Sequence, residues 1–259
     1  MPQKASNPAK TKTVSDRIEL LQKTARRDKK KFFKLLTGAF SDRSPAVRDT
    51  AVLLVTKHRL NDAAQLVEPL LYDTNKDVRY DAAECIGILQ RGRKSSPPGL
   101  RDLLRDHSAV VRAQALETLA LLEDKGTLPK IVRLLSDGNP FVRSYAASAV
   151  GVLDGIAYLK NLSRGLSAEK YDLARVGFYE ALFLLGKREI FPEMLALLES
   201  PDYHARCAVA NTLEVMPLAG QEIKLATAAL AAANRKPIAV ADETTTRRVL
   251  KALRTGNST

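Results

Sequence analysis

The feature that most constrains the fold of this chain is a short pattern that returns six times at nearly constant spacing. Each copy contains a Val-Arg or Ala-Arg pair, and successive arginines are 31, 33, 31, 32 and 31 residues apart. The six arginines are Arg48, Arg79, Arg112, Arg143, Arg175 and Arg206. Self-similarity at a period of about 20–50 residues is typical of solenoids and related repeat arrays. The chain is therefore expected to consist of stacked, similar units.

Each copy predicts a pair of helices. Apolar residues follow the arginine at offsets of three, seven and ten positions, which in the third copy are Ala115, Leu119 and Leu122. These offsets mark one face of an α-helix. A turn-like stretch precedes each arginine, and before it lies a second apolar segment that ends in a leucine pair or near-pair. Tryptophan is absent and aromatic residues make up 5% of the chain, which favours helix packing over a sheet.

In the first four copies an aspartate precedes the arginine by six positions, where the first helix of the unit ends. The planar guanidinium group can hold a carboxylate and loop carbonyls in fixed geometry. Stacked units would place these pairs in a row, each able to reach the next turn. Because the arrangement repeats, we interpret it as architecture rather than as a catalytic or phosphate-binding site. The predicted structural Asp-Arg ladder comprises Asp42, Arg48, Asp73, Arg79, Asp106, Arg112, Asp137, Arg143, Arg175 and Arg206.

The pattern LLxD(x5)VRxxAAxxLGxL resembles a short HEAT repeat, in particular that of the phycobilisome-lyase-type (PBS lyase) HEAT-like family. It is clearest in LLYDTNKDVRYDAAECIGIL and LLSDGNPFVRSYAASAVGVL. The last two copies depart from it, because Glu169 and Ser200 occupy the aspartate position and Ala174 and Ala205 replace valine. The resemblance implies an all-α fold, an α-α superhelix (HEAT-like α-solenoid) of about six helix-turn-helix repeats with terminal capping helices.

We predict four segments along the chain. Residues 1–13 combine Pro, Lys, Ser and Thr without periodicity and are expected to form a disordered basic tail. Residues 14–29 are expected to form an N-terminal capping helix with Ser15 as its N-cap. The six repeats occupy residues 30–216, and residues 217–259 hold C-terminal capping helices near 219–234 and 244–254, followed by a short tail.

The positive charge of the chain lies at its ends. The formal net charge is +12, of which residues 1–34 contribute +8 (eleven basic, three acidic) and residues 217–259 contribute +4 (seven basic, three acidic), leaving the middle neutral. A dense basic segment near the N-terminus could contact nucleic acid, acidic protein, a membrane surface or the chain's own groove; it comprises Lys23, Arg26, Arg27, Lys29, Lys30, Lys31 and Lys34.

The second helices of HEAT arrays line their concave face, which predicts a binding surface here. Positions that follow each arginine by one, two or five residues point away from the apolar stripe. They are polar with an acidic bias and include two tyrosines, so we expect a groove for a protein or peptide partner, with ordinary solvated helix face as the alternative. The candidate residues are Asp49, Tyr80, Asp81, Glu84, Gln114, Glu117, Tyr145, Ser148, Glu180 and Asn211.

The sequence favours a non-enzymatic scaffold or adaptor. It carries no HExxH, CxxC, GxGxxG or GxSxG pattern, so we predict no catalytic residue, metal site or cofactor. Its two cysteines fall in apolar helix patterns, and neither a secretory signal nor a membrane span is expected, which favours the cytoplasm. A nucleic-acid-associated protein that uses the basic ends is one alternative. A PBS-lyase-like or chaperone-type factor acting on a cofactor-bearing partner is the other, as the resemblance implies.

Overall fold

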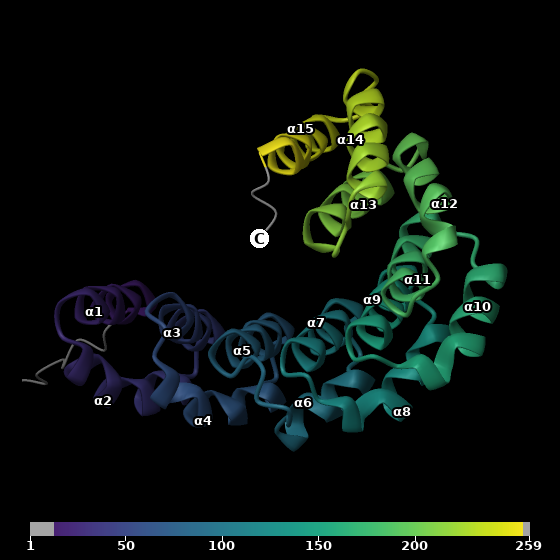
Figure 1. Cartoon of the computed structure of the whole chain (residues 1–259). Coiled ribbons are helices and arrows are strands. Elements are labelled where there is room, and N and C mark those ends of the chain that lie inside the picture. Colours follow the sequence, from purple (N-terminus) through teal and green to yellow (C-terminus); the bar gives the residue numbers. More distant parts are fainter. Residues whose placement is uncertain (1–12, 256–259) are drawn as a thin grey trace, which may run out of the picture. The chain divides into compact units, whose positions relative to one another are not determined.

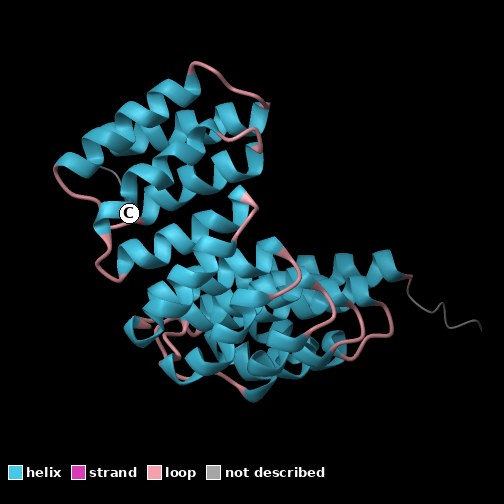
Figure 2. Cartoon of the chain, turned by 90° about the vertical axis from the view of Figure 1, so that its right-hand side faces the viewer, coloured by secondary structure: helices cyan, strands magenta, loops and turns pink. Residues whose placement is uncertain are grey.

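The computed structural model describes residues 13–255, and the regular elements in that range are all helical. Fifteen α-helices follow one another in chain order, joined by short loops and 3-10 turns, with no strand among the described residues (Figures 1 and 2). They pack in sequential pairs as in a HEAT-like solenoid, which confirms the all-α prediction. None of the described helices is both long enough and apolar enough to cross a membrane.

The helices form two compact units, each described here by itself. The first unit runs to Arg91 and includes Pro97–Leu100, while the second contains Gly92–Ser96 and the chain from Arg101 onward. The first unit holds α1 (Val14–Arg27), α2 (Lys29–Phe40), α3 (Pro45–Lys57), α4 (Ala64–Val67) and α5 (Lys76–Leu89), and α6 (Pro98–Asp102) has residues in both units. The second holds α7 (Ala109–Leu121), α8 (Leu128–Ile131), α9 (Pro140–Val152), α10 (Leu159–Ala168), α11 (Asp172–Leu184), α12 (Phe191–Ala196), α13 (Tyr203–Val215), α14 (Gln221–Asn234) and α15 (Val240–Thr255).

The second helices of the repeats are α3, α5, α7, α9, α11 and α13, and each begins three residues before its repeat arginine. The side chains at offset three are fully buried in all six repeats, and those at offset seven are at most 4% exposed. These positions form the predicted apolar stripe, because a 3.6-residue period keeps them on one side of the helix. The structure therefore confirms the predicted register of the second helices.

The first segments are less regular than the predicted helices. In four repeats the first segment is a short α-helix that is followed by a 3-10 turn. Such a helix is too short to be stable alone, so packing must stabilise it. These turns contain the leucine pairs and are Glu68–Tyr72, Leu103–Arg105, Val132–Ser136 and Leu197–Glu199. The first segment of the fifth repeat, α10, is instead one continuous helix with Gly165-Leu166 near its end. A Cβ atom at Gly165 would lie 2.4 Å from Phe178 Cε1, so glycine lets α10 approach α11 closely.

The two ends differ from the prediction in detail. Thr13, assigned to the tail by sequence, is the N-cap of α1 and forms a capping box with Asp16, so the prediction of Ser15 as the cap is wrong. Asp28 then caps α2 by accepting a hydrogen bond from the Lys31 backbone N–H. The two predicted C-terminal helices are present as α14 and α15. The rest of the predicted N-terminal tail and residues 256–259 lie outside the described residues.

Candidate binding surface

The repeat arginines join consecutive repeats. In the first unit Arg48 Nε and Nη2 donate to the two carboxylate oxygens of Asp73 at 2.5 and 2.6 Å. Asp73 belongs to the following repeat, and Arg48 reaches its own repeat only through the Asp42 carbonyl oxygen, to which Nη1 donates at 2.7 Å. Arg79 likewise donates to the Asp73 carbonyl oxygen at 2.8 Å. Arg48 therefore ties its own turn to a carboxylate 25 residues further along the chain.

The same geometry continues in the second unit. Arg112 donates to both carboxylate oxygens of Asp137 at 2.9 and 2.7 Å, and to the carbonyl oxygen of Asp106 at 2.8 Å. Arg143 binds Glu169 in the same bidentate way at 2.6 and 2.8 Å. Glu169, which departs from the aspartate pattern, thus keeps its function. Although burial acts to raise it, the pKa of Glu169 is lowered, because hydrogen bonds from Arg143 and the backbone stabilise its charged form.

The ladder extends beyond the predicted residues at its N-terminal end. Arg17, 31 residues before Arg48, binds Asp42 through Nε at 2.7 Å, and α1 begins three residues before Arg17. The helix expected to be a simple cap therefore has the register of a second helix. The 31-residue spacing is the signal that could have found it, although Asp16 precedes this arginine in place of valine or alanine.

The ladder changes character in the last two repeats. Arg175 Nη2 donates to the Tyr179 hydroxyl at 2.9 Å, and Ser200, at the carboxylate position of the next repeat, donates to Asp172 instead. Arg206 is 4% exposed and binds Asp242, which is fully buried, with an Nε to Oδ1 distance of 3.1 Å. Asp242 lies on α15, outside the repeats, so no repeat spacing could identify it.

The predicted binding residues of the first unit lie together on α3 and α5. Asp49, Tyr80, Asp81 and Glu84 are all half-buried. Burial raises the pKa of Asp81 to about 8, and a hydrogen bond with Asp49 together with the nearby acidic charges acts in the same direction. Oδ1 of Asp49 is buried without a hydrogen-bond donor in the described range. A protonated Asp81 carboxyl group that donates this hydrogen bond to Asp49 fits the raised pKa of Asp81.

The predicted residues of the second unit divide into three kinds. Tyr145, Ser148 and Glu180 are half-buried on α9 and α11. Burial raises the pKa of Glu180, whereas its hydrogen bond with Ser148 acts to lower that pKa. Glu117 on α7 is exposed. Gln114 is only 4% exposed and its side-chain amide donates to Thr118 at 3.3 Å. The prediction that Gln114 faces an open groove is therefore wrong, since its side chain lies among the packed helices.

Asn211 is exposed, but the C-terminal helix engages it. Arg248 on α15 donates to the Asn211 side-chain oxygen at 2.8 Å and also binds Glu214. Helix α15 packs along α13, so this part of the predicted groove has an internal partner. We call the remaining candidates of each unit, taken unit by unit, its second-helix face. In the first unit these are Asp49, Tyr80, Asp81 and Glu84 on α3 and α5, and in the second unit they are Glu117, Tyr145, Ser148 and Glu180 on α7, α9 and α11.

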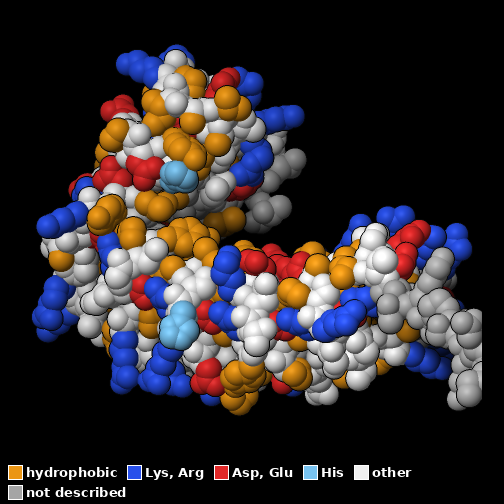
Figure 3. Space-filling view, turned by 180° about the vertical axis from the view of Figure 1, so that it is seen from behind, with side chains coloured by type: hydrophobic (Ala, Val, Ile, Leu, Met, Phe, Trp, Pro, Cys, Tyr) orange, Lys and Arg blue, Asp and Glu red, His pale blue; other side chains and the backbone are white. Residues whose placement is uncertain are grey.

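The basic segment is exposed at the junction of α1 and α2. All seven of its predicted residues are exposed, and Lys23 pairs with Glu19 at 2.6 Å. Figure 3 shows Lys and Arg side chains gathered near the end of the first unit that carries these helices. Phe32 is fully buried and Phe33 is 37% exposed. Lys29, Lys30 and Lys31 occupy the first turn of α2, where the helix dipole disfavours positive charge.

The described residues hold no group of three or more His, Cys, Asp or Glu side chains placed to bind a metal ion. Cys85 is buried, and burial raises its thiol pKa to about 11, partly offset by a hydrogen bond with Thr56. A thiol of this kind is a weak nucleophile near neutral pH.

Comparison with known proteins gives three findings. The family of HEAT repeats matches residues 33–120 and 97–182. Phycocyanobilin lyase subunit alpha of Nostoc sp. strain PCC 7120 is 28% identical over 136 residues, which is 52% of this chain and 41% of that protein, so the match spans less than half of that relative. A chain from the complex of CpcE and CpcF of phycocyanin lyase from Nostoc sp. PCC7120 superposes with a TM-score of 0.63 at 16% identity, covering 97% of this chain and 100% of that chain, which shows a shared fold.

Proposed function

We propose that this chain, which belongs to the HEAT-repeat family, is a lyase-like or chaperone-type factor. It acts by binding a partner protein that carries a cofactor. The chain supplies the second-helix face, and the cofactor belongs to the partner. The similarity to phycocyanobilin lyase subunit alpha supports this class of partner. The acidic bias of the face supports a partner with a basic docking surface.

The observation that carries the proposal is an exposed apolar residue among the carboxylates of the first unit. Leu53 lies four residues after Asp49 on the same side of α3 and is 46% exposed. An exposed apolar side chain on the same side of the helix as a half-buried acidic group resembles the centre of a protein interface. On this proposal Cys85 is not a nucleophile, since its thiol is buried and keeps its proton near neutral pH.

A site-specific photo-crosslinking experiment tests the proposal. A photoreactive amino acid at Glu117, exposed on the second-helix face, is compared with one at Glu193, which is also exposed and lies on α12. In the cells that encode the chain, position 117 is expected to yield a covalent adduct whose partner absorbs visible light, and position 193 is not. An adduct with a colourless partner that contains no cofactor would overturn the lyase-like assignment. Equal capture from both positions would overturn the assignment of the face.

The basic segment supports a second candidate function, binding to nucleic acid. Three lysines in the first turn of α2 oppose the helix dipole, so their placement costs stability. Residues that break a local rule in this way are expected at functional sites. Their dense positive charge at the α1–α2 junction suits the phosphate backbone of DNA or RNA.

Fluorescence anisotropy with labelled duplex DNA over a salt series tests this second function. The triple variant Lys29→Gln, Lys30→Gln, Lys31→Gln is compared with Lys57→Gln, Lys130→Gln, Lys160→Gln, which removes the same charge from other exposed sites. The first variant is expected to bind more weakly and to lower the salt slope by about 3, roughly one per lost phosphate contact. Equal weakening by both variants would show general charge attraction only.

A further inference from the structure

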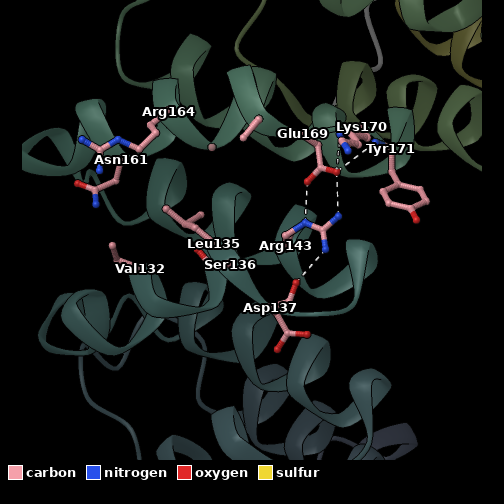
Figure 4. Close-up of a pocket in the computed structure, with 12 residues that line it drawn as sticks. Val132, Leu135, Ser136, Asp137, Arg143, Asn161, Arg164, Glu169, Lys170 and Tyr171 are labelled. Carbon is pink, nitrogen blue, oxygen red and sulfur yellow. Dashed lines mark hydrogen bonds and ion pairs between the residues drawn. The ribbon is translucent and has the colours of Figure 1, made fainter.

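The second unit contains a hollow away from the second-helix face. Its volume is about 450 Å³, and it lies between the 3-10 turn Val132–Ser136 and α10 (Figure 4). Pockets of about 300–1,000 Å³ are the size that small-molecule ligands occupy. No residue of the second-helix face lines this pocket.

The pocket lies where the repeat pattern is interrupted. In the second, third, fourth and sixth repeats a leucine pair ends the first segment, whereas α10 has Gly165, Leu166 and Ser167 there. The pair Arg143–Glu169 spans 26 residues, while Arg48–Asp73 and Arg112–Asp137 span 25. The fifth repeat therefore carries one extra residue. Ala168 then lines the pocket without a large side chain to fill it.

Both carboxylates that line the pocket are already neutralised. Glu169 accepts two hydrogen bonds from Arg143 and two more from the backbone N–H groups of Lys170 and Tyr171 at 3.0 and 3.1 Å. Asp137 is held in the same way by Arg112. Neither carboxylate is left with an uncompensated charge, so neither would repel an incoming anion.

The charges that remain are two cations. Arg164 and Lys170 line the pocket, and neither side chain has an acidic partner in the part of the chain that the structure describes. In Figure 4 Arg164 lies beside Asn161 on one side of the pocket, and Lys170 lies on the other side near Glu169. Val132 and Leu135 form the apolar part of the lining, and in Figure 4 Val132 lies on the side of Asn161 while Leu135 lies nearer the middle. The hollow thus combines an apolar wall with two uncompensated positive charges.

We infer that this pocket binds a small-molecule ligand that carries a carboxylate or phosphate group beside an apolar portion. Arg164 binds the anionic group, with the neighbouring Asn161 amide as a further donor and Lys170 adding positive charge from across the pocket, and Val132 and Leu135 contact the apolar portion. The inference is independent of the proposed partner protein. The pocket and the second-helix face share no residue, so one assignment can fail while the other holds.

Methyl NMR titration of the full chain tests the inference, with phenyl phosphate as the probe and the methyl groups of Val132 and Leu135 as reporters. Phenyl phosphate is expected to shift these methyl signals, whereas inorganic phosphate and phenol bind more weakly because each lacks one half of the ligand. Higher ionic strength is expected to weaken binding, since two exposed charges contribute. Inorganic phosphate binding as tightly as phenyl phosphate would reduce the site to general anion attraction and overturn the inference.

Matched variants locate the site. Arg164→Gln and Lys170→Gln are each expected to weaken phenyl phosphate binding at least threefold, and together about tenfold, which corresponds to about 1.4 kcal/mol. Lys160→Gln is the control, because Lys160 is exposed on the same helix but does not line the pocket. Ala168→Leu keeps both charges while filling the hollow, and it is expected to block the probe. Binding that survives Ala168→Leu, or that Lys160→Gln weakens equally, would overturn the assignment.

Discussion

At the scale of single residues, the repeat arginines act by joining two repeats rather than by closing one turn. Arg48, Arg112 and Arg143 each hold a carboxylate of the next repeat and a carbonyl oxygen of their own. A bidentate contact of this kind fixes both distance and angle, because the guanidinium fork matches the carboxylate. The stacking of neighbouring repeats is therefore specified by polar contacts as well as by apolar packing.

The most buried arginine should be the most sensitive to substitution. Arg206→Met is expected to cost about 3–5 kcal/mol, because it leaves Asp242 as a buried charge without its partner. Arg247→Met, which breaks the exposed Arg247–Glu243 pair within α15, is expected to cost less than about 1 kcal/mol. Urea unfolding measures both changes. Equal losses would contradict the importance of burial here.

The Asp49–Asp81 pair predicts an unusual dependence of stability on pH. The pKa of Asp81 is about 8 in the folded chain against an ordinary value of 3.8, so between these values the folded state binds a proton that the unfolded state has lost. The free energy of unfolding should then fall as pH rises through this window. Asp81→Asn cannot titrate, so it should reduce the slope and be more stable than the natural chain above about pH 8.

Urea unfolding at a series of pH values from about 5 to 9 checks this prediction. Glu193→Gln is the control, because it removes an exposed carboxyl group elsewhere and should leave the slope unchanged. An unaltered slope in Asp81→Asn would show that Asp81 does not retain a proton in the folded chain over this pH range.

At the scale of helices, α9 and α11 approach each other so closely that glycine is required between them. A Cβ atom at Gly177 would lie 2.1 Å from the Ser144 carbonyl oxygen, and one at Gly151 would lie 2.5 Å from the Ala181 Cα. Both neighbours are backbone atoms, which cannot move aside as a flexible side chain can. The two glycines therefore set the distance between these helices.

Substitution at this contact should destabilise the second unit. Gly177→Ala is expected to cost about 1–3 kcal/mol, because the two helices must move apart to accommodate one methyl group. Gly138→Ala is the control, since nothing lies within 4 Å of a Cβ atom there. Denaturant unfolding compares the two variants. A near-neutral result for Gly177→Ala would show that the helices separate at little cost.

At the scale of the whole molecule, stability should depend on neighbour-to-neighbour packing, as in other repeat proteins. The buried cluster at the C-terminal end of the second unit joins residues from α11 to α15, including Val209, Leu213, Val249 and Leu253. Helix α15 also supplies Asp242 and Arg248, which bind α13 side chains. This last helix therefore completes the unit by covering the second helix of the sixth repeat.

Removal of residues 240–259 should expose this cluster and destabilise the end of the second unit first. Hydrogen exchange by mass spectrometry is expected to show faster exchange in α13 and α14, while α3 in the first unit keeps its protection. Uniform loss of protection along the chain would contradict nearest-neighbour coupling. Unchanged protection in α13 would show that α15 contributes little to the folded state.

The sequence by itself determined the all-helical fold, the six repeats, the start of each second helix and the buried stripe. These features are periodic and local, so a 3.6-residue spacing within a 31–33-residue repeat encodes them directly. The same spacing also contained Arg17, which was missed because Asp16 precedes it. Glu169 departs from the aspartate pattern, yet it binds Arg143. Its longer side chain reaches the arginine although the two residues are 26 positions apart instead of 25.

Only the tertiary structure decided which carboxylate each arginine binds, that Gln114 is buried, and that α15 covers part of the predicted groove. It also revealed the pocket beside α10, where Ser167 replaces the second leucine of the pair found in four of the other repeats. These features depend on groups that lie 25 or more residues apart in the sequence. Their meeting is set by how helices stack, and helix stacking has no local spacing from which it can be read.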